Sequence, residues 1–376
     1  MNPKISILIP VYKESKLLPS ILNKLLTQKI EKEVFIIIDE PSEYSLRISN
    51  EFHEKVKFII NNERIGKVNA LNKAARSASS EVLLFLDADV EIPNDESFLD
   101  KILKETEKAD IVDVKKEVVR DSFLAKMSYY EYVSFNVCSW LMAKFVKKTP
   151  AINGAAFAIK RHVFDRLGGF RKVISEDLDI ATRAFLNGYK FAYVKETNVY
   201  NHVHSSWRKW MTQRRRWSIG AALWFKEWFK DLLKRCIKKP QVFIPALFLL
   251  FPSSIIPIIN IFSLNLPVLN LTSVPFHFIS IASLFLAVNF NFMLPILLLI
   301  HVGLNILQNF SASIIAFLTF SSSFFILSRK LSFKFKLHEF LIYYFVYSFL
   351  SLLIMIAALI RVLIFNKRNE KLDWKV

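Results

Sequence analysis

The strongest constraint on this chain is a stretch of 88 residues, 241–328, that contains no Asp, Glu, Lys or Arg. A second run without these residues covers 340–360. A membrane-spanning helix takes about 20 apolar residues. The alternative explanation is the core of a soluble domain, but such cores are built from segments with charged outer faces. The length therefore predicts three spans in the first run and one in the second. We place them near 241–263, 275–298, 302–327 and 340–364.

The residues around these runs predict the rest of the organisation. We expect a soluble domain over 1–220 and an interfacial amphipathic helix over 221–240, where aromatic and basic residues interleave. The transmembrane domain would occupy 241–366, and 367–376 would form a cytoplasmic tail. The apolar stretch at the amino terminus is too short for a secretory signal. We therefore predict a multi-pass protein of the cell membrane whose soluble domain is cytoplasmic.

The chain is basic, with 51 Lys and Arg against 33 Asp and Glu, a formal net charge of +18. Nucleic acid is one partner that such a charge suggests, but the basic residues concentrate beside the apolar runs. Charge that flanks membrane spans explains this placement, so we predict membrane lipids as partners and no nucleic acid. The basic segment 328–336 disagrees with four spans, which would place it outside. Cys138 and Cys236 have no metal-ligand spacing and are predicted to be packing residues.

Apolar runs of strand length recur near the amino terminus, and helical patterns lie between them. The runs cover 5–12, 34–39, 56–61 and 81–89, and the helical patterns cover 15–28 and 66–78. Uninterrupted apolarity suits strands that are covered on both faces. The alternation predicts an α/β fold with a mostly parallel, Rossmann-like sheet. The aromatic-rich segment 122–148 is predicted to be a core helix or a helix that lies against the membrane or under an acceptor.

Ligands bind at the carboxyl ends of the strands in such sheets, and three of the predicted strands end on polar residues there. These residues are Tyr12 to Glu14, Asp39 with Glu40, and Asp87 with Asp89. Two carboxylates brought together repel each other unless a cation lies between them, and Mg²⁺ or Mn²⁺ prefers oxygen ligands shared with substrate phosphates. The spacing of Asp87 and Asp89 therefore indicates either a metal site or turn residues after a strand.

Two helix starts carry charged residues with both a structural and a chemical explanation. Gly66 and Lys67 open one helix, where free backbone amides and a lysine can meet an anion; a solvated lysine is the alternative. Glu176, Asp177 and Asp179 open another, where acidic residues also offset the helix dipole. His202 and His204 alternate as metal ligands can, but no third ligand lies nearby in sequence. We predict that these two are strand or loop histidines.

The segment QRRRW, 213–217, joins three arginines to a glutamine and an indole. An arginine fork matches a phosphate bidentately, and the indole offers a flat face to a sugar ring. A basic stretch beside the membrane would explain the arginines but not Gln213 and Trp217. We expect Arg216→Ala to abolish activity, and Arg214→Ala and Arg215→Ala mainly to weaken lipid or domain contacts.

Together these residues form an ordered pattern: a strand-end Asp, then D-x-D, E-D and Q-x-x-R-W, followed by membrane spans. Over about residues 3–220 the chain resembles glycosyltransferase family 2, in the branch of cellulose, chitin and hyaluronan synthases and ceramide glucosyltransferase. The resemblance implies a GT-A fold, a nucleotide-sugar donor, a divalent metal (Mg²⁺ or Mn²⁺) and inversion at the anomeric carbon. It implies a membrane-bound hexosyltransferase that acts on a lipid-linked or glycan acceptor in polysaccharide or glycolipid biosynthesis.

The resemblance also implies a role for each matching residue. Asp177 would be the general base, with Glu176 beside it, and Asp89 with Asp87 would hold the metal. Gln213 and Trp217 would frame the acceptor. The donor would contact Pro10, Tyr12, Glu14, Asp39, Lys67, Asp87 and Arg216.

The sequence departs from the family pattern at 39–42, where it reads DEPS in place of Asp-Asp-Gly. This changes a turn that borders the donor, so UDP is the expected nucleotide but not a certain one. Two alternatives stay open. One is a polyprenyl-phosphate glycosyltransferase, whose acceptor phosphate is already ionised and needs no base. The other is a transporter with a nucleotide-sensing domain, against which stands the absence of Asp, Glu, Lys and Arg from the first three predicted spans. The sugar, the oligomeric state and whether transfer is processive are left open.

Overall fold

The computed structural model describes residues 3–238, 240–242, 245, 314–315 and 317–365. Most of the first predicted span, all of the second and half of the third lie outside these residues. Among the described residues, one helical segment is long and apolar enough to cross a membrane, Leu337–Leu363, with a mean hydropathy of 2.3. This segment overlaps the predicted fourth span. The agreement rests on its length and composition alone. The chain divides into two compact units, one of which contains 1–249, 338–343 and 353–376.

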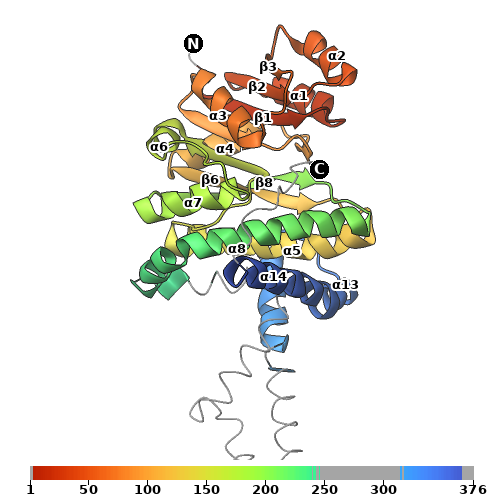
Figure 1. Cartoon of the computed structure of the whole chain (residues 1–376), viewed down its shortest axis with the longest axis vertical. Helices are drawn as coiled ribbons and strands as arrows, with labels where there is room; N and C mark the ends of the chain where they lie inside the picture. The colour runs from red at the N-terminus through yellow and green to blue at the C-terminus, as the bar shows by residue number, and fades with distance from the viewer. Residues whose placement is uncertain (1–2, 239, 243–244, 246–313, 316, 366–376) are drawn as a thin grey trace, which may run out of the picture. The chain divides into compact units, whose positions relative to one another are not determined.

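The first unit is built on an eight-stranded sheet in the order β3-β2-β1-β4-β7-β6-β8-β5 (Figure 1). Strands β1 to β4 pair in parallel, and β6 pairs in parallel with β8, while β7 and β5 pair antiparallel with their neighbours. The strands are β1 Ile5–Tyr12, β2 Lys32–Asp39, β3 Lys57–Asn61, β4 Val82–Leu86, β5 Val90–Glu91, β6 Ile111–Val118, β7 Ala156–Lys160 and β8 Phe191–Asn201. The predicted α/β class is confirmed, and only β7 and β5 run against the other six strands.

Helices connect and cover the strands. The described helices are α1 Leu18–Leu26, α2 Glu43–Phe52, α3 Lys67–Ser77, α4 Phe98–Thr106, α5 Phe123–Leu141, η1 Met142–Val146, α6 Arg161–Arg166, α7 Glu176–Asn187, α8 Trp207–Lys238, η2 Pro240–Val242, α13 Leu337–Ile342, η5 Tyr343–Tyr347 and α14 Ser348–Leu363. Helix α2, with Ser42 as its amino-terminal cap, was not among the predicted helices.

The apolar runs form strands because they can be buried on both faces of the sheet. In β1 every residue from Ile5 to Ile9 is fully buried, and β2 is buried from Glu33 to Asp39. The register pairs Ile5 with Lys32 and Tyr12 with Asp39, so the two strands end level. Their carboxyl ends therefore bring the polar residues that follow each strand to one edge of the sheet.

Helix α5 is largely buried, which supports the core-helix alternative for the segment 122–148. Of its 19 residues, 15 are buried, including Cys138. It packs against β6, and Figure 1 shows it beside α8. Helix α8 runs without a break through residue 220, so the QRRRW segment and most of the predicted interfacial segment lie on one helix of 32 residues.

Candidate active site

The candidate site forms where two helices begin close to the carboxyl ends of β1 and β4. Helix α3 begins at Lys67 after Gly66, whose φ of +84° is a conformation that favours glycine. The Gly66 amide donates to Oδ2 of Asp39 at 2.8 Å, which ties the start of α3 to the end of β2. Helix α7 begins at Glu176 and Asp177, as the sequence predicted.

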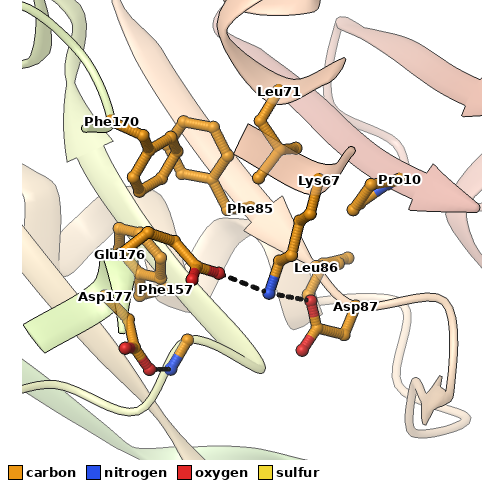
Figure 2. Close-up of a pocket in the computed structure, with 11 residues that line it drawn as sticks. Pro10, Lys67, Leu71, Phe85, Leu86, Asp87, Phe157, Phe170, Glu176 and Asp177 are labelled. Carbon is orange, nitrogen blue, oxygen red and sulfur yellow. Dashed lines mark hydrogen bonds and ion pairs between the residues drawn. The ribbon is translucent and has the colours of Figure 1, made fainter. Parts of the chain in front are cut away.

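Lys67 bridges two carboxylates that are far apart in sequence. Its Nζ lies 2.8 Å from Oδ1 of Asp87 and 3.0 Å from Oε1 of Glu176, as Figure 2 shows. Burial lowers the pKa of Lys67, but the two carboxylates outweigh burial and hold its pKa above the usual range. The ammonium group is therefore charged, and it is placed to meet an anion at the strand ends.

Asp177 lies beside this bridge and is held by two backbone amides. Gly154 donates to Oδ2 at 2.8 Å, and Leu178 donates to Oδ1 at 2.8 Å. Burial, followed by the negative charge of Glu176, raises the pKa of Asp177 to about 6, although Lys67 and the two amides oppose this shift. A carboxylate with a pKa in this range can take a proton near neutral pH, which is what a general base must do.

Asp87 and Asp89 follow β4, and their chemistry fits a shared divalent cation. Loss of solvation by the surrounding protein, followed by the negative charge of Asp87, raises the pKa of Asp89 to about 6. Among the described residues, no cluster of three or more His, Cys, Asp or Glu could hold a metal ion. Two carboxylates fit Mg²⁺ or Mn²⁺ when substrate phosphates complete the coordination. The site therefore suits a metal that arrives with a phosphate ligand.

Aromatic residues form an apolar wall behind the charged groups. The ring centroid of Phe85 lies 5.1 Å from that of Phe157 and 4.8 Å from that of Phe170. Together with Leu71 and Pro10 they line a cavity of about 10 Å³ that the charged residues complete (Figure 2). This volume holds about one water molecule, so a nucleotide sugar does not fit inside the cavity as it stands.

The residues predicted to surround the nucleoside lie at the ends of β1 and β2, but several already have internal partners. The Tyr12 hydroxyl donates to Glu40 at 3.1 Å, and the guanidinium of Arg64 lies 4.2 Å from the centre of the Tyr12 ring. Asp39 is buried and accepts from Gly66 and from Asn61. Glu14 accepts from the Ser42 hydroxyl at 2.7 Å. Glu40, in the departure from the family pattern, has a φ of +49°.

The arginines of QRRRW differ in their surroundings. Arg214 is buried and pairs with Glu131 of α5, and its guanidinium lies 4.6 Å from the centre of the Trp217 ring. Arg215 is exposed and Arg216 is half-buried. Arg214 thus makes a contact within the domain, between α8 and α5. The effect of Arg214→Ala on such contacts stays a prediction.

The structure thus brings together part of the predicted site. The cavity is lined by Pro10, Lys67, Asp87, Glu176 and Asp177. The other predicted residues lie outside this lining, namely Tyr12, Glu14, Asp39, Asp89, Gln213, Arg216 and Trp217. His202 and His204 follow β8 in a loop, as predicted, and His202 lies 3.5 Å from Glu91.

Sequence reasoning missed Gly154, which holds Asp177, and Glu131, which pairs with Arg214. The signal for Gly154 was the Asn153-Gly154 pair before β7, since Asn-Gly marks a turn. No pattern in the sequence pointed to Glu131, which lies inside an aromatic helix.

A charged lysine, paired carboxylates and a candidate base near the strand ends of an α/β sheet form an arrangement that suits an enzyme acting on an anionic ligand. Residues 6–168 match the model of the family "Glycosyl transferase family 2". The chain therefore carries a glycosyltransferase family 2 domain, and the predicted class of enzyme, a glycosyltransferase, is confirmed. The matched range ends before Glu176, Asp177 and the QRRRW segment.

Relatives with glycosyltransferase names extend beyond that range. The chain is 28% identical over 285 residues to "Probable glycosyltransferase YdaM" of Bacillus subtilis, covering 69% of this chain and 67% of the relative. It is 27% identical over 223 residues to poly-beta-1,6-N-acetyl-D-glucosamine synthase of Staphylococcus epidermidis, covering 58% and 54%. The chain thus spans about two thirds of the first relative and about half of the second.

Among solved structures, the chain is similar to a mannosyltransferase from Pyrobaculum calidifontis in complex with GDP-Man and Mn²⁺. The TM-score is 0.48 with 22% identity, over 61% of this chain and 65% of that chain. It is also similar to Staphylococcus aureus TarS 1–349 in complex with UDP-GlcNAc. There the TM-score is 0.41 with 16% identity, over 58% and 66% of the two chains.

Proposed function

We propose that this protein is a membrane-bound, inverting glycosyltransferase. It would move a sugar from a nucleoside diphosphate sugar, UDP being the expected nucleotide, to a hydroxyl of a lipid-linked or glycan acceptor. The observation that carries the proposal is the bridge from Asp87 through Lys67 to Glu176, with Asp177 beside it. In this proposal Lys67 is the cation that meets the diphosphate and Asp177 is the base for the hydroxyl, and the contacts between these residues support it.

The chemistry follows from what each side chain can do. Asp177 takes the proton of the acceptor hydroxyl as its oxygen attacks the anomeric carbon. Lys67 and Arg216 stabilise the negative charge that develops on the leaving nucleoside diphosphate. Because attack and departure occur on opposite sides of the carbon, one displacement inverts its configuration. A divalent cation held by Asp87 and Asp89 would supply further charge stabilisation at the diphosphate.

The acceptor is proposed to be a hydroxyl because the site contains a base. Asp177 has a raised pKa of about 6, which suits proton removal from a hydroxyl. A phosphate acceptor is already ionised and would gain nothing from such a group. The names of two relatives, poly-beta-1,6-N-acetyl-D-glucosamine synthase and "Probable glucomannan 4-beta-mannosyltransferase 6" of Oryza sativa, support a glycan acceptor.

A donor screen tests the proposal directly. The full chain in detergent would be incubated with a panel of nucleotide sugars, with and without Mn²⁺, and hydrolysis and thermal stabilisation would be measured. We expect one nucleoside diphosphate sugar to be consumed in a Mn²⁺-dependent manner. Consumption that requires an added polyprenyl phosphate would favour the alternative acceptor, and no consumption of any donor would contradict the proposal.

The second half of α8 supports membrane association. Phe225, Phe229, Leu233 and Ile237 are all exposed. Their spacing of four residues puts them on one helix face. Exposed Lys230 follows Phe229, and exposed Lys234 follows Leu233. Lysines that alternate with apolar residues in this way are typical of a helix at an anionic membrane surface. We propose that this face lies in the lipid interface, with the catalytic domain in the cytoplasm and four spans in all.

Thiol accessibility tests this arrangement in sealed inside-out vesicles. In a Cys236→Ser background, Phe229→Cys should be protected from a water-soluble thiol reagent and Lys230→Cys should react. Equal reactivity at both positions would contradict an interfacial helix. A tag after Val376 should be cleaved by protease from the cytoplasmic side, and cleavage only from the outer side would make the number of spans odd.

A further inference from the structure

Gly220 lies in the middle of α8, three residues after Trp217, where a glycine is unfavourable for the helix by about 1 kcal/mol relative to alanine. Its φ is not in the left-handed region, so the backbone does not require it. A Cβ at this position would overlap Oγ of Ser175 and lie 2.8 Å from Cγ2 of Ile174. The absence of a side chain thus permits α8 to approach the segment just before α7.

That segment leads directly into the catalytic pair, because Ser175 immediately precedes Glu176 and Asp177. The approach of α8 to α7 is fixed further along by two polar contacts. Trp224 Nε1 donates to Thr182 Oγ1 at 2.8 Å, and Arg171 joins Glu227 of α8 to Asp179 of α7 at 2.8 and 2.9 Å. The contact at Gly220 is made with Ser175, the residue directly before Glu176.

Helix α8 cannot simply move away to make room for a side chain at 220. Ile219 and Ala222 pack on Ala358 and Val362 of α14, in a cluster that Ile174 also contacts. Ala222 is fully buried. Ser175 can rotate its hydroxyl, but Ile174 is β-branched and stiff at χ1. A methyl group at 220 would therefore shift α8, α7 or both.

We propose that Gly220 is a positioning residue that sets the distance between the acceptor-side residues on α8 and the base on α7. This role rests on the proposed function. Gln213, Arg216 and Trp217 lie on the same helix as this glycine, which meets the residue directly before Glu176. Donor binding at β1, β4 and α3 does not depend on that contact.

The test compares Gly220→Ala with wild type in the full chain, using three measurements. Transfer from the nucleotide sugar that the screen identifies should fall at least tenfold in kcat, while Mn²⁺-dependent binding of the matching nucleoside diphosphate should stay unchanged by calorimetry. Thermal denaturation provides the control for helix propensity, which by itself would stabilise Gly220→Ala. Wild-type transfer by this variant, or an equal loss of transfer and of nucleotide binding, would overturn the proposal.

Two further variants test the contact itself. Ile174→Ala should restore part of the transfer in the Gly220→Ala background, because it removes the methyl group that the new Cβ would meet. Ser175→Thr should crowd the same contact from the other side and lower kcat without altering nucleotide binding, which keeps the proposal testable if Gly220→Ala fails to fold. If Ile174→Ala restores nothing, the positioning role is wrong. If wild type transfers no sugar, the proposed function fails. The contact between residues 174 and 220 can still be tested then, because the shifts in denaturation midpoint of Ile174→Ala and Gly220→Ala should not add up in the double variant.

Discussion

The backbone amide of Gly154 donates a hydrogen bond of 2.8 Å to Oδ2 of Asp177, and a Cβ at residue 154 would lie 2.9 Å from that same oxygen. The loop before β7 therefore touches the candidate base without any side chain between them. An amide donor favours the charged form of a carboxylate, so Gly154 both orients Asp177 and limits the rise of its pKa. Glycine is the residue that allows both at this distance.

Gly154→Ala should displace the Asp177 carboxylate and lower kcat about tenfold or more, because small misplacements of a reacting group are costly. Nucleoside diphosphate binding should be retained, since Lys67 and Asp87 are not touched. Transfer kinetics and calorimetry on the same preparation would check this. Unchanged kcat would show that the carboxylate can move without loss.

The pH dependence of transfer should report the ionisation of Asp177. A base must be deprotonated, so with a pKa of about 6 we expect kcat to be constant at high pH and to fall about tenfold per pH unit below 6. Glu176→Gln removes a charge that raises this pKa, so its acid limb should move to lower pH. Asp177→Asn should lower kcat by ~10²-fold or more at high pH, where Asp177 of wild type is ionised, and should show no acid limb. An acid limb that persists in Asp177→Asn would assign it to another group.

The sequence predicted the parts of the site that depend on local pattern, and missed those that depend on contacts between distant segments. Asp87 after a buried strand, Lys67 at a helix start and Glu176 with Asp177 in a first turn were all predicted, because apolar periodicity and helix-start chemistry place them. The bridge through Lys67 was not predicted, because it joins residues 20 and 109 positions apart (87 − 67 and 176 − 67). Strand β7 also runs against its neighbours, and nothing in its five residues indicates direction.

Metal dependence should run through Asp89. In wild type, nucleoside diphosphate should bind more tightly with Mn²⁺ than with a chelator, because the cation shares its coordination with the phosphates. Asp89→Ala should lose that difference and keep the weaker, metal-independent binding that Lys67 supports. Glu91→Ala, which removes a nearby carboxylate paired with Lys24, serves as the matched control and should keep the Mn²⁺ effect. Equal affinity with and without Mn²⁺ in wild type would make Asp87 and Asp89 turn residues only.

Replacement of Arg214 and of Arg216 by alanine should affect different properties. Arg214→Ala should lower stability, and Arg216→Ala should lower transfer. Arg214→Ala removes the guanidinium that pairs with buried Glu131, and removing one side of a buried ion pair typically costs about 3–5 kcal/mol. Its denaturation midpoint should therefore fall.

Glu131→Gln combined with Arg214→Gln should recover part of that stability, since no unpaired charge remains. Arg216→Ala should unfold like wild type but lose transfer, because its charge acts on the leaving diphosphate. Arg215→Ala, on an exposed residue of the same run, is the control and should change neither property much. Equal losses of transfer at all three positions, with equal stability, would mean that the run acts as an undivided charge patch, and the assignment of Arg216 to the diphosphate would be wrong.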